Sequence, residues 1–244
     1  MVKISDVTSD TFFNGRLRIK QDRAGYRFSI DAVILAHIAG ENPGKQVLDL
    51  GTGCGIIPLI LAYRHPEIRI VGVEVQPELA ELAKGNITDN QMADRIRIQC
   101  RDLKTLTPDP ALQPFDLVLG NPPFYPAQAG RINPNRQRAI ARHEITVTLS
   151  DVVQTASRML ETNGRFLTLY PAERLAEVLT ELAACKLEAR MLRMIHMETG
   201  RPAKLFVVEG VKNAKSELTI RPPLVIYNKP GVYSAEAARM YEPC

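Results

Sequence analysis

A strand that stops at two consecutive prolines constrains this chain more than any other stretch. The apolar run from Asp116 to Gly120 leads directly into Asn121-Pro122-Pro123-Phe124. Proline fixes its own φ, restricts the residue before it and has no backbone N–H, so a sheet ladder ends here. The strand end then presents an amide side chain, carbonyls without strand partners and an aromatic ring. Two hydrogen-bond acceptors beside a flat ring predict a pocket for a planar amine such as a nucleobase.

Strands and helices alternate on both sides of this stretch. Apolar patterning predicts parallel strands at 45–50, 68–74, 95–100, 115–119 and 165–170, with helices between them. Short links between these elements favour one α/β sheet with helices on both faces. Two more strands, 188–196 and 204–211, are joined by a link too short for a crossover helix, so we expect them to pair antiparallel. The tail at 218–227 is expected to add a further edge strand.

The chain reads as one domain with a short lead-in. We expect residues 1–28 to form a basic N-terminal extension, in which the alternation from Leu17 to Lys20 predicts a short strand or hairpin. Residues 29–244 are expected to form a single domain. Its first helix begins with Ser29 or Asp31 as cap and ends at Gly40.

The composition excludes several classes of protein. Four scattered cysteines form no CxxC pair, and four scattered histidines form no HExxH motif, so neither a disulfide scaffold nor a metal site is expected. No signal peptide and no apolar run near ~18 residues is visible, which predicts a cytoplasmic protein with no membrane segment. The net charge of +4 is compatible with a solvated basic surface or with an anionic partner.

A glycine-rich loop follows the first strand of the predicted sheet. Asp49, Gly51, Gly53 and Gly55 alternate with other residues between this strand and an apolar helix. Such a loop lets a ligand approach the backbone closely. A dinucleotide loop would read G-x-G-x-x-G, and the acidic residue would repel a pyrophosphate. The pattern therefore favours S-adenosylmethionine, whose ammonium group suits the carboxylate of Asp49.

Two further acidic residues follow the next strands. Glu74 ends the second strand, where a carboxylate can accept hydrogen bonds from both ribose hydroxyls. Asp102 follows the third strand, where a carboxylate can accept from an adenine amino group. Since ligands of open α/β sheets bind at the carboxyl ends of the strands, we expect these groups and Asn121 to lie at one edge. The arrangement predicts a methyl donor beside a methyl acceptor.

These motifs resemble a known enzyme class. Four of them are similar, in order and spacing, to the motifs of S-adenosylmethionine-dependent amino-methyltransferases: Asp49 to Gly55, Glu74, Asp102 and Asn121 to Phe124. More narrowly, the segments 28–36, 121–124 and 141–144 resemble the bacterial family that methylates N6 of the adenine next to the anticodon in a valine tRNA.

This resemblance has implications for fold and site. It implies a Rossmann-like class I methyltransferase sheet of seven strands, mostly parallel with an antiparallel last strand. It also implies that S-adenosylmethionine is the cofactor, that Asp31 helps to close the cofactor site and that Asn121-Pro122-Pro123-Phe124 holds the target adenine.

A basic loop follows the predicted acceptor pocket. Its cationic side chains are either solvated or form a lip that contacts RNA phosphates, and we expect the second: Arg131, Arg136, Arg138, Arg142 and His143. The expected partner is thus a nucleic acid, in particular tRNA.

Enzymes that methylate other acceptors share the Asn-Pro-Pro-aromatic motif. Guanine N2 of rRNA and the glutamine of a release factor remain alternatives, although the glutamine enzymes carry Tyr at the position of Phe124. A DNA adenine enzyme would need a separate recognition region, and a dehydrogenase is disfavoured by the glycine spacing. A non-catalytic RNA-binding module is the alternative from a different class. The sequence leaves the RNA, the nucleotide and the oligomeric state open.

Overall fold

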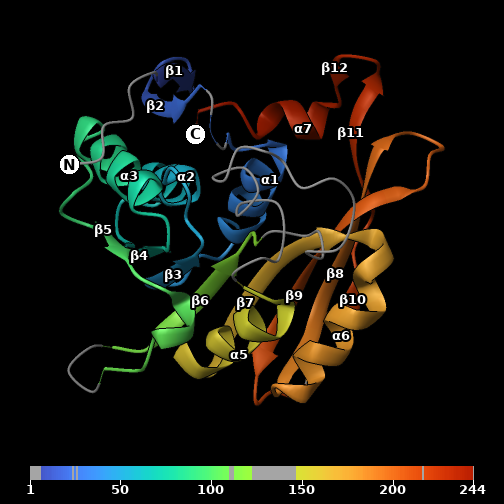
Figure 1. Ribbon diagram of the computed structural model, residues 1–244. Helices are drawn as coiled ribbons and strands as arrows, with labels where there is room; N and C mark the ends of the chain where they lie inside the picture. The colour runs from blue at the N-terminus through green and yellow to red at the C-terminus, as the bar shows by residue number, and fades with distance from the viewer. Residues whose placement is uncertain are drawn as a thin grey trace.

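One large sheet organises the computed structural model, which describes residues 7–23, 25, 27–109, 113–122, 147–215 and 217–243. Within these residues the sheet has ten strands, in the order β12-β11-β8-β9-β7-β6-β3-β4-β5, with β10 beside β8 (Figure 1). The strands are β3 Gln46–Leu50, β4 Arg69–Glu74, β5 Ile96–Cys100, β6 Phe115–Gly120, β7 Leu160–Pro171, β8 Leu187–Glu198, β9 Ala203–Lys212, β10 Thr219–Ile220, β11 Leu224–Lys229 and β12 Val232–Tyr233.

The predicted seven-stranded arrangement corresponds to the part of this sheet from β8 to the edge strand β5. Strands β5, β4, β3, β6 and β7 are parallel, and β9 lies antiparallel between β7 and β8. The short β10, β11 and β12 extend the sheet beyond β8, and β11 confirms the expected edge strand in the tail. Register places Leu50 opposite both Val73 and Gly120, so the carboxyl ends of β3, β4 and β6 lie together.

Helices cover both faces of the sheet, as predicted (Figure 1). Helices α1 Ile30–Ala39, α2 Ile56–Arg64 and α3 Pro77–Asp89 pack on one face, and α5 Leu149–Met159 and α6 Leu175–Ala184 on the other. Leu117 and Leu119 of β6 belong to the first hydrophobic cluster, while Val118 between them belongs to the second. The strand therefore buries both of its faces, which explains its continuous apolar sequence.

The boundaries of β7 differ from the prediction. The strand begins at Leu160, directly after α5 ends, so Asn163-Gly164 lies inside the strand and does not terminate the helix. Asn163 has a left-handed φ of 65°, near a shift in the register between β6 and β7. At the other end, β7 extends to Pro171, and a 3-10 turn, η2 Ala172–Arg174, precedes α6. Asn adopts left-handed backbone more readily than most residues, which explains why it is tolerated inside the strand at this position.

The N-terminal segment forms a hairpin of β1 Val7–Phe12 and β2 Leu17–Asp22. The alternation from Leu17 to Lys20 predicted a short strand or hairpin, and the structure has the hairpin, with Leu17–Lys20 in its second strand. Leu17 and Ile19 are fully buried and belong to the same hydrophobic cluster as α1, α2 and α3. The hairpin is thus packed against the helices that cover the first face of the sheet, with β2 bonded to α3.

Aromatic rings join the hairpin to the end of the chain. Tyr227 of β11 stacks on Tyr233 of β12 with centroids 5.1 Å apart, and Tyr233 stacks on Tyr241 at 5.4 Å. Tyr241 follows the short helix α7 Ala235–Arg239 and stacks on Phe12 of β1, also at 5.4 Å. We call these four rings the aromatic stack. Offset stacking at such distances is favourable beyond the area that it buries, so the two ends of the described chain stabilise each other.

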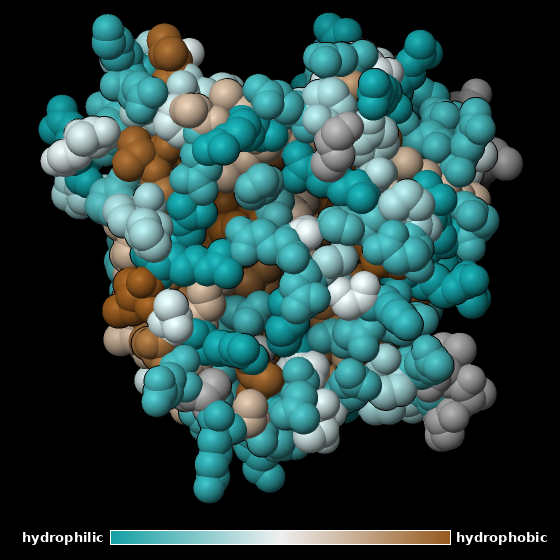
Figure 2. Space-filling view, turned by 180° about the vertical axis from the view of Figure 1, so that it is seen from behind, coloured by the Kyte–Doolittle hydropathy of each residue, from teal (hydrophilic) through white to brown (hydrophobic). Residues whose placement is uncertain are grey.

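The surface is predominantly polar. Figure 2 shows hydrophilic side chains over most of one face, with hydrophobic residues in small separate groups. The exposed large hydrophobic residues of the described segments are Val7, Val75, Leu218, Ile220, Val232 and Tyr233. No helix among the described residues combines the length and hydrophobicity needed to span a membrane.

Replacing Phe166 with alanine should destabilise the fold strongly. Phe166 lies on β7 with no exposed surface, inside the second hydrophobic cluster. Removing a buried phenyl ring leaves a cavity, and we expect the free energy of unfolding to fall by about 3 to 5 kcal/mol. Ile220→Ala, at a position that is 67% exposed, should change it by less than about 0.5 kcal/mol. Urea denaturation of both variants measures the difference, and similar losses would contradict the assignment of this core.

Candidate functional site

Polar side chains gather where β3, β4 and β6 end. Asp49 lies near the end of β3, Glu74 ends β4, and Asn121 follows β6. The three strands are adjacent and parallel, so their carboxyl ends form one edge of the sheet. This confirms that the sheet brings together the residues that the sequence placed at strand ends, although it does not by itself test their roles.

The loop between β3 and α2 has the backbone conformation that its glycines allow. Gly51, Gly53 and Gly55 have φ values of 75°, 57° and 85°, all in the left-handed region. The amides of Gly51 and Thr52 both donate to the Val73 carbonyl, at 2.9 and 3.0 Å. A side chain placed on Gly51 would meet no atom within 4 Å. The loop is therefore braced against β4 while Gly51 leaves open space for a ligand to approach the backbone.

Glu74 braces the same loop through its carboxylate. One oxygen accepts from the Gly53 amide at 3.0 Å, and the other accepts from the Gln76 amide at 2.9 Å. Burial raises the pKa of this carboxyl, which is only 5% exposed, and the backbone donors oppose the shift. Each carboxylate oxygen has a second lone pair, so Glu74 can accept further hydrogen bonds from a ligand. Its predicted contact with ribose hydroxyls stays a prediction.

Asp49 is buried near the end of β3. The residue is 1% exposed, and neither carboxylate oxygen has a hydrogen-bond partner among the described residues. Burial raises its pKa to about 7, the nearby Thr52 hydroxyl opposes this shift, and the neighbouring Glu74 carboxylate adds to it. A buried carboxylate without partners is costly, so it is retained most readily where a ligand supplies the missing contact.

Asp31 and Asp102 take part in local structure at the same end of the molecule. Asp31, in the first turn of α1, accepts from the Ser29 hydroxyl at 2.8 Å, and burial raises its pKa. Asp102 accepts from the Lys104 amide at 2.9 Å and so caps the 3-10 turn η1 Leu103–Thr105. Their expected contacts with a cofactor remain predictions.

The acceptor motif begins at the buried end of β6. The Thr168 hydroxyl donates to the Gly120 carbonyl at 2.8 Å and fixes the strand end. The side-chain oxygen of Asn121 is buried and has no hydrogen-bond partner among the described residues, and Pro122 is buried. Further members of the predicted site lie outside the described residues, namely Pro123, Phe124, Arg131, Arg136, Arg138, Arg142 and His143.

An asparagine that was not predicted as a site residue supports the glycine loop. Asn86 of α3 is 1% exposed, and its amide donates to the carbonyls of Lys20 and Cys54, both at 2.9 Å. Its oxygen accepts from the Lys20 amide at 2.8 Å. Asn90, one turn later, binds the backbone of Arg18 in the same way, at 3.0 and 2.7 Å. Two asparagines four residues apart share a helix face, and this spacing was the available signal.

These features fit S-adenosylmethionine, the cofactor implied by the resemblance. The buried carboxylate of Asp49 can meet a cationic amino acid moiety. The open space at Gly51 gives access to the backbone, and Glu74 retains acceptor capacity for hydroxyl groups. Val75, which directly follows Glu74, is 42% exposed and offers an apolar surface at the same edge.

Asn86→Ala should weaken S-adenosylmethionine binding at least tenfold. The substitution removes the hydrogen bond to the Cys54 carbonyl and so loosens the glycine loop. Asn90→Ala is the matched control, because it frees the hairpin at Arg18 without touching the loop, and it should change the Kd less than threefold. Isothermal titration measures both, and equal losses would show that the effect comes from the hairpin.

The affinity for the same cofactor should rise with pH up to neutrality. Because the pKa of Asp49 is raised to about 7, its carboxyl is mostly neutral at pH 6 and mostly ionised at pH 7.5 or above. Only the ionised form attracts an ammonium group, which itself loses its proton near pH ~8. Titrations across about pH 6 to 7.5 should show tightening in the wild type. An Asp49→Asn variant with the same slope would refute this assignment.

Comparison with known proteins places the chain among methyltransferases. The family model "Methyltransferase small domain" matches residues 29–182. The tRNA1(Val) (adenine(37)-N6)-methyltransferase of Porphyromonas gingivalis is 32% identical over 243 residues, which cover 96% of this chain and 94% of the relative. The protein of the same name from Histophilus somni is 30% identical and covers 91% of both chains.

The fold is shared with solved structures. A predicted O-methyltransferase from Agrobacterium tumefaciens superposes with a TM-score of 0.68 at 21% identity, over 86% of this chain and 95% of its own. At this identity the similarity shows the fold, and the sequence relatives show the family. The chain belongs to the methyltransferase small domain family and, within it, to the family of the tRNA1(Val) (adenine(37)-N6)-methyltransferases.

Proposed function

We propose that this protein transfers a methyl group from S-adenosylmethionine to the exocyclic N6 amine of an adenine in tRNA, the adenine next to the anticodon. One observation carries the proposal: the Asn121 oxygen and the Asp49 carboxylate, which have no hydrogen-bond partner among the described residues, lie at the same sheet edge. An amine acceptor and a cationic donor therefore have complementary groups side by side. The relatives, which align with almost the whole chain, are named for this reaction.

The cofactor contributes a methyl group bonded to a positively charged sulfur when it is bound. In this chain, the glycine loop, Asp49 and Glu74 would hold it, with Asp31 and Asp102 at the margins of the site. Burial of the Asp49 and Glu74 carboxyls excludes water from competing for these contacts.

The acceptor side must make a weak nucleophile reactive. The lone pair of the adenine amine is delocalised into the ring. The Asn121 oxygen and the Pro122 carbonyl can each accept one N–H, which returns electron density to nitrogen and fixes the group in place. Phe124 would hold the plane of the base. Correct placement of two reacting groups is worth about 7 to 11 kcal/mol when the geometry is well made.

This chemistry needs no strong general base and no metal. The amine proton becomes acidic only after methyl transfer, so acceptors that are already in position are sufficient. An adenine in an anticodon loop is partly unstacked, which lowers the cost of bringing it into such a pocket.

We further propose that a basic segment contacts RNA phosphates beside the pocket, through Arg131, Arg136, Arg138, Arg142 and His143. We also propose that residues 1–28 act as an extension of the domain at 29–244, and that the enzyme works in the cytoplasm, where its substrate is found.

The reaction is tested by methyl transfer from labelled cofactor to unmodified tRNA, rRNA, DNA and a release factor. We expect N6-methyladenosine in tRNA on nucleoside analysis. Labelled N2-methylguanosine in rRNA or labelled protein would favour the corresponding alternative acceptor. Cofactor binding without transfer to any of these substrates would favour a non-catalytic RNA-binding module.

Asn121→Ala should reduce turnover far more than cofactor binding. Removing one preorganised hydrogen-bonding group from a reacting centre costs about 10² to 10³ in kcat. The Kd for S-adenosylmethionine should change less than threefold, because Asp49 and Glu74 remain. Asn121→Asp keeps an acceptor oxygen and should retain more turnover than the alanine variant. Single-turnover assays with titration of the cofactor separate the two quantities, and parallel losses in both would contradict the assigned role.

A further inference from the structure

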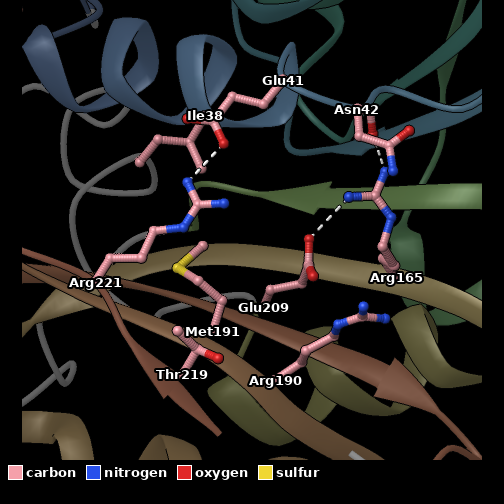
Figure 3. Close-up of a pocket in the computed structure, with 9 residues that line it drawn as sticks. All are labelled: Ile38, Glu41, Asn42, Arg165, Arg190, Met191, Glu209, Thr219 and Arg221. Atoms are coloured by element: carbon pink, nitrogen blue, oxygen red, sulfur yellow. Dashed lines mark hydrogen bonds and ion pairs between the residues drawn. The ribbon is translucent and has the colours of Figure 1, made fainter.

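A cavity of about 290 Å³ lies near the amino-terminal end of β6, and Figure 3 shows the residues that line it. It is partly open to solvent and is lined by residues at the carboxyl end of α1 and on or beside strands β7 to β10. Arg165, one of its lining residues, pairs with Leu117 near the start of β6, whereas Asn121 follows the end of that strand. The cavity is therefore separate from the residues assigned to methyl transfer.

Two ion pairs form walls of this cavity. Arg165 binds Glu209 at 2.8 Å, with side chains only 17% and 14% exposed, and it also donates to the Asn42 carbonyl. Arg221 binds Glu41 at 2.6 Å. Figure 3 shows the two pairs facing each other across the cavity, with Met191 on the strand side. The two charges within each pair neutralise each other. The Arg221–Glu41 pair and the bond from Arg165 to Asn42 connect the end of α1 to the sheet.

A third arginine is unpaired. Arg190 is exposed and has no hydrogen bond or ion pair among the described residues. Arg190 and Met191 are consecutive yet both line the cavity, although neighbours in a regular strand point to opposite faces. Strand β8 pairs Ala189 with Gly210 and Met191 with Glu209, so Arg190 is the extra residue of a β-bulge. Bulges often re-aim a side chain, and this one turns a free guanidinium into the cavity.

We propose that the cavity is a binding site for a phosphate group, carried by a free nucleotide or by an RNA backbone. Three guanidinium groups and two carboxylates line it, which leaves one positive charge to neutralise. A guanidinium can bind phosphate through two parallel N–H donors, and Arg190 has all of its donors free for this. The volume suits one nucleotide or a smaller anion. The site does not depend on the proposed reaction.

The experiment titrates the full chain, saturated with S-adenosylhomocysteine to fill the cofactor site, with inorganic phosphate and with uridine 5′-monophosphate. Arg190→Gln is compared with Arg97→Gln, an exposed strand arginine at the other side of the sheet. Circular dichroism and the affinity for S-adenosylhomocysteine confirm that each variant is folded. The same proteins then bind unmodified tRNA over a series of salt concentrations.

Two results would support the site, and they distinguish its ligand. In the first, the affinity for phosphate or for uridine 5′-monophosphate falls at least tenfold in Arg190→Gln and less than twofold in Arg97→Gln. This result identifies a free phosphorylated ligand. If neither small probe binds, the tRNA titrations decide. A slope of log affinity against log salt concentration that falls by about 1 only in Arg190→Gln assigns the phosphate to RNA. If Arg190→Gln and Arg97→Gln behave alike in both titrations, the proposal is overturned. The small-probe titrations report on the cavity even if no methyl transfer occurs.

Discussion

The rest of this structure depends on the buried carboxylate of Asp49, which has no hydrogen-bond partner in the described part of the chain. Asp49 can be kept at the end of β3 only because the parallel strands on either side and helices on both faces hold it there. Burial at this position raises the pKa of the Asp49 carboxyl. The neighbouring loop is fixed from three directions, by the Val73 carbonyl, the Glu74 carboxylate and the Asn86 amide. The stability of the scaffold thus offsets the free-energy cost of burying the Asp49 carboxylate, and a cationic ligand can supply the contacts that this carboxylate lacks.

Much of this architecture could be predicted because it follows from local patterns. The apolar run ending in Asn121-Pro122 marked the end of β6, and alternation of strands with helices predicted the parallel sheet. Since parallel strands end at one edge, the position of Asp49, Glu74 and Asn121 at that edge followed as well. Glycines in left-handed conformations confirm the type of loop that the spacing indicated.

The features that could not be predicted are those in which distant segments determine the outcome. Arg165 binds the carbonyl of Asn42, far away in sequence, and only the folded sheet brings them together. The bulge at Arg190 has no local sequence pattern, because the register of the partner strand creates it. The spacing of Asn86 and Asn90 marks one face of α3, but it does not show that the hairpin lies on that face. Short α7 lacks the length at which hydrophobic periodicity becomes visible.

The aromatic stack has a consequence for how the protein is made. During synthesis on the ribosome, the hairpin that bears Phe12 emerges before Tyr241. Until Tyr241 has also emerged, Phe12 lacks its stacking contact with that ring. The stack can therefore close only after the hairpin and α3, which Asn86 and Asn90 tie together, have both been made.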